Sequence, residues 1–183
     1  MNDDPTELLK KHGKTFNFAR LFLGKETGIA AARLYRFCRI VDDIADESPD
    51  PYIAKIKLKA LKESITQGSG DHPVVQDFLN LCDEYQINKH HGITLIDGVS
   101  QDLNLVALPS LDTLIQYAFR VAGVVGLMMA PILGAKKVGH AFAIDLGIGM
   151  QLTNIARDVL EDAQMGRRYL PGEWVNKLTA SQI

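Results

Sequence analysis

The chain has 183 residues, of which 46% are hydrophobic and 23% charged, a composition that excludes a wholly disordered or fibrous protein. Its 20 Lys and Arg against 22 Asp and Glu give a formal net charge of −2, so we expect no nucleic-acid partner. Two cysteines, Cys38 and Cys82, are too few for a disulfide framework and lack zinc-site spacing, which fits a reducing, cytoplasmic setting.

Apolar residues repeat with helical spacing along the chain, starting after an N-terminus that lacks signal-peptide features. Leu8, Leu9 and His12 predict a first short helix, and Phe16, Ala19 and Leu23 predict a second. Longer helices are predicted over residues 27–47, 52–65, 74–85, 89–103, 111–133 and 136–163. Because no alternating strand pattern of useful length occurs, we expect residues 1–183 to form a single all-α domain.

The longest apolar run, residues 121–133, is interrupted only by Gly123, Gly126 and Pro131. It is too short to span a bilayer, so a helix that is buried on all sides or lines an apolar cavity is expected. Its glycines, together with Gly147 and Gly149, leave room for a long apolar ligand or else permit close helix packing.

A first acidic motif, residues 41–47, places Asp42 and Asp46 four residues apart, so their side chains share one helix face. Asp43 and Glu47 form a parallel pair about 100° around the helix. Acidic residues at a helix C-terminus are unfavourable with the helix dipole, which favours a functional reason for them. A solvated helix end before Pro49 is the alternative.

A second acidic motif places Asn154, Asp158 and Asp162 at intervals of four, with Gln151 extending the same stripe. The preceding residues, 141–150, are strongly apolar, and a polar stripe on such a helix is costly unless it is satisfied. Carboxylates with an amide carbonyl, completed by water and phosphate oxygens, are a typical Mg²⁺ site. An exposed face whose acids pair with Arg157 and Arg167 is the alternative.

The two motifs together predict an acidic cleft between two helices, in which their side chains bind Mg²⁺ ions. Arginines near both motifs indicate a cation-bridged diphosphate, since guanidinium groups match phosphate oxygens; these are Arg36, Arg39, Arg157, Arg167 and Arg168. The predicted chemistry is ionisation of an allylic diphosphate, with the carbocation shielded from water in an apolar cavity. Aromatic faces can stabilise that cation, although such residues are more often plain core; the candidates are Tyr35, Phe37, Phe119 and Tyr169.

Residues 35–46 resemble the first aspartate motif of the squalene/phytoene synthase family, and residues 151–162 with 166–171 resemble the second. Residues 121–126 resemble the segment between them, and Lys14-Thr15-Phe16, Asp97-Gly98 and Asp102-Leu103 also fit. The stretch 121–171 is most similar to bacterial phytoene synthases. The resemblance implies an all-α isoprenoid-synthase fold of the class I terpenoid synthase type.

The resemblance further implies head-to-head (1′–1) condensation of two prenyl diphosphates through a cyclopropylcarbinyl diphosphate. Phytoene from geranylgeranyl diphosphate is the first expectation, and squalene or dehydrosqualene from farnesyl diphosphate is the alternative. The implied cofactor is Mg²⁺, or Mn²⁺, with NADPH needed only for squalene. Because the products are insoluble in water, peripheral membrane contact is expected.

Site residues carry over from the family by position. Asp42 and Asp46 would bind the metal with one diphosphate, and Asn154, Asp158 and Asp162 with the other. Six residues would contact diphosphates or reacting carbons, with Tyr35 and Arg39 counted as catalytic: Tyr35, Arg39, Gln151, Arg157, Arg167 and Tyr169. Phe119, Val121 and Gly123 would line the substrate site.

Two departures from the family leave alternatives open. Phe119 stands in a segment that is often rich in tyrosine, and family members continue well beyond this length with helices that close the cavity. A C-terminally truncated chain is therefore expected, because residues 174–178 also resemble the start of a helix. A non-catalytic relative acting as a binding or assembly protein is one alternative. A chain-elongating synthase or terpene cyclase is another.

Overall fold

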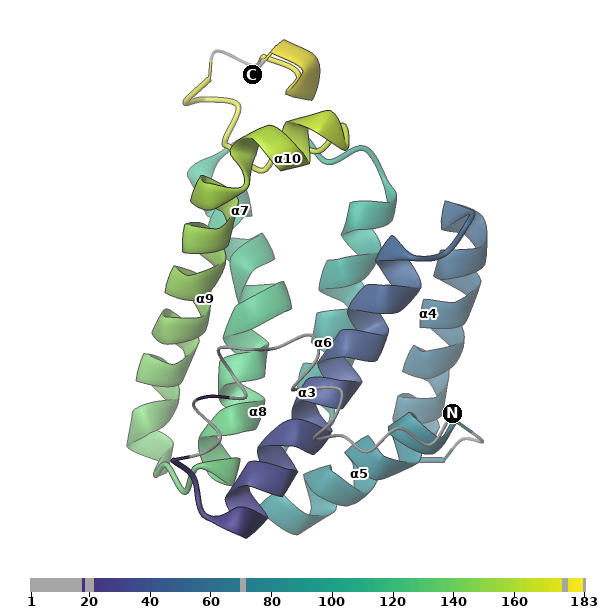
Figure 1. The fold of residues 1–183 in the computed structure, drawn as a ribbon, viewed down its shortest axis with the longest axis vertical. Helices are drawn as coiled ribbons and strands as arrows, with labels where there is room; N and C mark the ends of the chain where they lie inside the picture. The colour runs from purple at the N-terminus through teal and green to yellow at the C-terminus, as the bar shows by residue number, and fades with distance from the viewer. Residues whose placement is uncertain (1–17, 19–21, 70–71, 176–177, 183) are drawn as a thin grey trace.

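The computed structural model describes residues 18, 22–69, 72–175 and 178–182 (Figure 1). Every regular element in these residues is a helix, and their one β-type contact is an isolated bridge between Ala107 and Arg168. The predicted all-α fold class is confirmed for this part of the chain. The helix predicted near residue 8, most of the one near residue 19, and Lys14-Thr15-Phe16 lie outside the described residues.

The first four of these helices, which are long and α-helical, lie close to their predicted positions. They are α3 (Lys25–Asp46), α4 (Pro51–Gln67), α5 (Pro73–Tyr85) and α6 (His90–Val99), followed by the 3₁₀ turn η1 (Ser100–Leu103). Local chemistry sets the ends of α4: Asp50 accepts a hydrogen bond from the Tyr52 N–H at 2.8 Å, and Pro51 begins the helix. Gly68, with φ 72°, ends it in the left-handed conformation that glycine adopts without strain.

The main core lies where α3, α5, α6 and α8 (Val124–Ile132) meet α4. Phe37 of α3 stacks on Phe78 of α5 with ring centroids 3.8 Å apart. Gly92 of α6 lies under these rings, where an added Cβ would be 2.7 Å from Phe78. Phe37 is therefore a core residue and does not face a substrate cavity. For this residue, the alternative that the candidate aromatics belong to the core is the one that applies.

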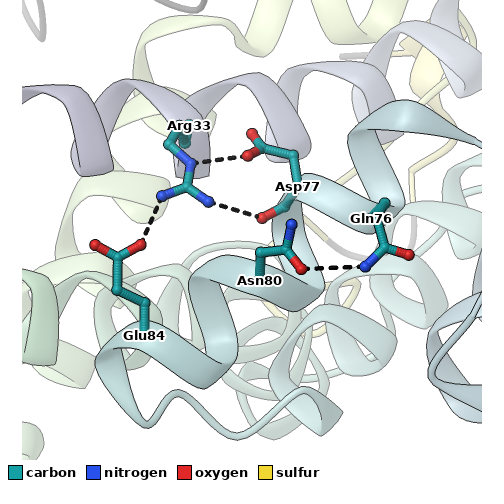
Figure 2. Close-up of polar contacts among 5 residues, drawn as sticks. All are labelled: Arg33, Gln76, Asp77, Asn80 and Glu84. Carbon is teal, nitrogen blue, oxygen red and sulfur yellow. Dashed lines mark hydrogen bonds and ion pairs between the residues drawn. The ribbon is translucent and has the colours of Figure 1, made fainter.

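A polar clamp on the outer side of this core ties α3 to α5 (Figure 2). The Arg33 guanidinium donates to the Asp77 carboxylate and the Glu84 carboxylate, each at 2.8 Å, and to the Asp77 carbonyl at 3.2 Å. Its donors are thus shared between two turns of α5. The clamp fixes the direction of α3, which ends in the first acidic motif.

The predicted helix over 111–133 is one continuous run, made of α7 (Leu111–Ala118), the π-helical turn η2 (Phe119–Gly123) and α8. Its 22 residues are long and apolar enough to cross a membrane by length and composition alone, a test that buried core helices also pass. In this structure the run packs against α6 and α9 (His140–Arg157). Val124 and Met128 are fully buried in the main core.

The last predicted helix, 136–163, is not continuous. It is divided into η3 (Lys137–Gly139), α9 and α10 (Val159–Gln164), with a break at Asp158, where φ is −101° and ψ 14°. The short η4 (Ala180–Gln182) follows. In Figure 1, α10 lies across the upper end of the bundle, where α3 and α9 both end.

Candidate functional site

The two acidic motifs meet at the end of the bundle where α3 and α9 finish (Figure 1). They line one cleft of about 250 Å³, to which α3, α9 and α10 contribute side chains. All five predicted metal ligands border this cleft: Asp42, Asp46, Asn154, Asp158 and Asp162. Four other predicted site residues border it as well: Val121, Gln151, Arg167 and Tyr169.

The break at Asp158 does not separate the second motif. The Asp158 N–H donates to the Asn154 carbonyl at 2.9 Å, and the Asp162 N–H donates to the Asp158 carbonyl at 2.8 Å. These bonds keep the i to i+4 pattern across the break, so the three side chains still border one cleft. The prediction of a single uninterrupted helix is nevertheless wrong.

The segment after the second motif is held by backbone pairing with residues 106–109. The Arg168 N–H donates to the Val106 carbonyl at 2.9 Å, and the Leu108 N–H donates to the Arg168 carbonyl at 3.2 Å. The buried Arg168 side chain donates to the carbonyls of Leu108 at 3.1 Å and Leu170 at 2.7 Å. Arg168 is therefore structural, and it places its neighbours Arg167 and Tyr169 at the cleft.

Arg167 joins the two motifs directly. Its Nη2 donates to Oδ1 of Asp46 at 3.3 Å, across 121 residues of sequence. The guanidinium therefore lies among the carboxylates, with further donors for an anion that enters the cleft.

A buried polar group at the cleft includes two residues that the sequence analysis did not place in the site, Asp102 of η1 and Tyr117 of α7. The Tyr117 hydroxyl donates to Oδ2 of Asp102 at 2.8 Å, and the Tyr117 ring stacks on Tyr169 at 5.0 Å. Oδ1 of Asp102 is buried and has no hydrogen-bond partner. The only sequence signal for Asp102 was that Asp102-Leu103 fits the family pattern.

Burial and mutual repulsion weaken the acidity of several cleft carboxyl groups. Desolvation, followed by the nearby charge of Asp46, raises the pKa of Asp42 to about 7. Desolvation raises the pKa of Asp102 to about 6, against the opposing hydrogen bonds from Tyr117 and Tyr169. Desolvation and Asp158 also raise the pKa of Asp162. Bringing these carboxyl groups together costs free energy that a bound cation would recover.

The donor set fits a hard cation that is shared with another oxygen-rich ligand. The cleft presents carboxylate and amide oxygens, the ligands that Mg²⁺ prefers, and the unpartnered Asp102 oxygen lies beside them. In the part of the chain that the structure describes, however, no three His, Cys, Asp or Glu side chains are grouped so that they could hold a metal ion alone. Phosphate oxygens or water would have to complete the coordination.

Two predicted arginines do not border the cleft. Arg39 is absent from the cleft lining, and its Nη2 is 2.6 Å from Oδ1 of Asp43. Arg157 is exposed, and its Nε and Nη2 each donate to Asp158 at 2.6 Å. In this structure, neither side chain is placed for its predicted contact with a diphosphate, because each guanidinium already binds a neighbouring carboxylate.

Three other predicted residues also lie outside the cleft lining: Tyr35, Phe119 and Gly123. Tyr35 lies two helical turns before Asp42 on α3. Desolvation raises its pKa, and the nearby charge of Arg39 partly opposes this shift. Phe119 packs against the main core, and a Cβ on the buried Gly123 would be 2.9 Å from its ring. The cleft hydroxyls belong to Tyr117 and Tyr169 instead.

The glycines of the long helices mostly serve close packing. A Cβ at Gly147 would be 2.5 Å from the Ala122 carbonyl oxygen, and one at Gly126 would collide with the Ala143 carbonyl. Gly149 differs, since a Cβ there would meet nothing within 4 Å. Of the two explanations for these glycines, helix packing applies to Gly123, Gly126 and Gly147.

Comparison with known proteins places this geometry in a family. A model of the squalene/phytoene synthase family matches residues 9–182. The 15-cis-phytoene synthase of Paracoccus sp. is 32% identical over 96% of this chain and 61% of the relative. The 4,4′-diapophytoene synthase of Staphylococcus haemolyticus is 32% identical over 96% of this chain and 64% of the relative. The chain thus spans about three fifths of the length of these curated relatives.

Solved structures show the same fold. A dehydrosqualene synthase crystallised with a ligand superposes with a TM-score of 0.84 at 29% identity, covering 94% of this chain and 62% of that one. The squalene synthase HpnC of Alicyclobacillus acidocaldarius superposes with a TM-score of 0.79 at 20% identity, covering 94% and 68%. The isoprenoid-synthase fold expected from the resemblance is confirmed.

Proposed function

The chain belongs to the squalene/phytoene synthase family, and we propose that it carries the diphosphate-binding centre for head-to-head condensation of two prenyl diphosphates. The observation that carries the proposal is the single cleft bordered by both acidic motifs and bridged by the 3.3 Å hydrogen bond from Arg167 to Asp46. This arrangement suits two diphosphate groups, because each motif offers its own carboxylates and Arg167 lies between them.

The first motif would hold a metal ion with Asp42 and Asp46, and the second with Asn154, Asp158 and Asp162. Bound Mg²⁺, or Mn²⁺, would neutralise the leaving diphosphate and act as a Lewis acid. Arg167 would donate to diphosphate oxygens, for which it would exchange its contact with Asp46. Gln151 would donate its amide N–H to the same group.

The apolar part of the cleft would protect the carbocation that ionisation leaves behind. Val99, Val121 and Ile155 border the cleft beside the acids and offer no nucleophile. The stacked rings of Tyr117 and Tyr169 present aromatic surface that can stabilise positive charge. The released diphosphate would accept the proton that is lost at the end of the reaction, so no strongly basic side chain is required.

Geranylgeranyl diphosphate is the proposed substrate, with phytoene as the product. The Paracoccus relative, named a 15-cis-phytoene synthase, supports this choice, while the equally identical diapophytoene synthase supports farnesyl diphosphate as the alternative. NADPH would be consumed only if the product were squalene. An apolar product of this kind also supports contact between the protein and the surface of a membrane.

Incubation of the purified chain with Mg²⁺ and each diphosphate, with and without NADPH, tests the proposal. Hydrocarbons extracted into organic solvent are identified by mass spectrometry, and inorganic diphosphate binding is measured in parallel by calorimetry. Phytoene without NADPH is the expected product. Absence of both a hydrocarbon and Mg²⁺-dependent diphosphate binding would overturn the proposal.

A second candidate is binding of prenyl diphosphates without turnover. Mg²⁺-dependent diphosphate binding with no hydrocarbon product in the same experiment would identify this case.

A further inference from the structure

The loop that joins α8 to α9 lies at the end of the bundle remote from the acidic cleft (Figure 1). We call residues 133–139 the distal loop. Its two large apolar side chains, Leu133 and Val138, have exposed fractions of 51% and 79%. Lys136 and Lys137 lie between them in sequence and are exposed as well. One short segment therefore presents both apolar and positively charged side chains to solvent.

Backbone hydrogen bonds hold the distal loop in a compact turn. The Ala135 N–H donates to the Ala130 carbonyl at 2.9 Å, which closes the end of α8 around Gly134, whose φ is 72°. The Gly139 N–H donates to the Lys136 carbonyl at 2.7 Å, which closes the turn before α9. Because both ends are closed in this way, the backbone holds the exposed side chains out in solvent, where a flat surface can meet them.

The charge of the distal loop differs from that of the whole chain. The chain has a net charge of −2, yet no Asp or Glu occurs between Asp112 and Asp145. Among the described residues, neither Lys136 nor Lys137 forms an ion pair, in contrast to two lysines of α4 that bind carboxylates. The loop leads into α9, whose first turn has no side-chain cap, so its backbone N–H groups add positive potential.

We propose that the distal loop docks the protein onto the surface of a bilayer that contains anionic lipids. Lys136 and Lys137 would meet the phosphate oxygens of the headgroups, while Leu133 and Val138 would enter the boundary between headgroups and acyl chains. A lipid surface fits better than a protein partner, because a stable protein interface buries about 800 Å² on each partner and the loop is far smaller.

The position of the distal loop would orient the protein on the membrane. Because the cleft lies at the opposite end of the bundle, docking leaves the cleft facing the aqueous phase that supplies Mg²⁺ (Figure 1). The inference goes beyond the proposed function, because it names the membrane-facing surface and depends on neither substrate nor turnover.

Vesicle binding by the purified chain tests the proposal. One set of vesicles contains equimolar phosphatidylcholine and phosphatidylglycerol, and the other contains phosphatidylcholine alone. Binding is measured by sedimentation with the vesicles, without Mg²⁺ or prenyl diphosphate. The test variants are the double variant Lys136→Gln with Lys137→Gln, which removes the charge, and Val138→Gln, which removes an apolar contact.

Two changes on α4 serve as matched controls. The double variant Lys57→Gln with Lys59→Gln removes the same charge from exposed positions, and Ile56→Gln removes an apolar side chain whose exposed fraction is 52%. Circular dichroism checks that every variant keeps its helical content and melting temperature. Calorimetry of Mg²⁺-dependent binding of inorganic diphosphate, expected to be equal in all variants, tests the proposed function separately.

We expect the native chain to bind the anionic vesicles more tightly than the neutral ones. The double variant of Lys136 and Lys137 should weaken this binding about 25-fold, or about fivefold for each lysine. Val138→Gln should weaken it about fivefold, while the α4 controls leave it unchanged. Failure to bind anionic vesicles would overturn the proposal, as would equal weakening by the controls. An oligomer of the chain alone that Val138→Gln dissociates, detected by light scattering, would also overturn it, because a second copy would then be the occupant.

Discussion

At the scale of single residues, the carboxylates of the cleft differ in how they are held. Asp42 and Asp102 lie in surroundings that weaken their acidity, with pKa values raised by desolvation to about 7 and about 6. Asp158 is half-buried, and the hydrogen bonds from Arg157 lower its pKa. Asp158 is therefore ionised and ready to bind a cation, at the cost of its contact with Arg157.

Asp158→Asn should lower hydrocarbon formation by about two to three orders of magnitude, since the variant loses electrostatic stabilisation of the leaving diphosphate. The melting temperature should hardly change, because asparagine keeps the shape of this half-buried side chain. Steady-state product assays and Mg²⁺-dependent diphosphate binding measure the effect. Glu161→Gln, an exposed neighbour outside the cleft lining, is the control. Full activity and binding in Asp158→Asn would contradict the assigned role.

Tyr117→Phe should destabilise the fold by about 1–3 kcal/mol, since it removes the donor to the buried carboxyl of Asp102. The same change should raise the pKa of Asp102 further above its ordinary value. Urea unfolding measures the first effect and carbon NMR of the labelled carboxyl group the second. The exposed Tyr52→Phe serves as control. A pKa of Asp102 that stays in place would show that the hydroxyl does not act on it.

At the scale of elements, sequence periodicity predicted the helices well where their signals are local. The ends of α3, α4 and α5 fall within two residues of the prediction, because prolines, an Asp cap and a glycine mark them. The π-helical turn at Phe119–Gly123 and the break at Asp158 were not predicted. Neither follows from the residues alone, since both arise where helices are fitted against partners distant in sequence.

Two nearby glycines lie on the packed and the exposed sides of α9, so we expect opposite effects on stability when each is replaced by alanine. Gly147→Ala should destabilise the chain by about 1–3 kcal/mol, because the added methyl would lie against the backbone of Ala122. Gly149→Ala should stabilise it by about 0.5–1 kcal/mol, since alanine favours the helix and the space is open. Thermal and urea unfolding of both variants provide the comparison. Equal effects at the two positions would contradict the packing described for α9.

At the scale of the whole molecule, the spacing of acids predicted much of the cleft but not all of it. The i to i+4 rule places Asp42 with Asp46 and Asn154 with Asp158 on shared faces, and the fold brings those faces to one cleft. The rule does not say which neighbouring arginine side chain borders the cleft. Arg39, which was predicted to contact a diphosphate, pairs with Asp43 instead. Asp102 was missed because a single acid in a short turn has no spacing signal, and only tertiary contacts bury it.

The stability of the metal-free chain should fall as pH rises, because the cleft concentrates carboxyl groups that resist ionisation. The pKa of Asp42 rises from 3.8 to about 7 on folding. A carboxyl group with a raised folded-state pKa contributes stability below its unfolded-state pKa, and this contribution is lost as pH rises through the folded-state value. The loss from Asp42 should therefore develop between about pH 4 and pH 7 and reach at most about 4 kcal/mol.

Asp42→Asn isolates this contribution, since asparagine keeps the shape of the side chain and cannot ionise. Urea unfolding in the presence of EDTA, from pH 5 to pH 8, should show Asp42→Asn becoming progressively more stable than the native chain. The exposed Asp83→Asn should run parallel to the native chain. Adding Mg²⁺ with inorganic diphosphate should stabilise the native chain at pH 8 far more than Asp42→Asn, because only the native carboxylate can share its charge with the cation. Parallel stability curves for Asp42→Asn and the native chain would show that burial of Asp42 does not oppose folding at neutral pH.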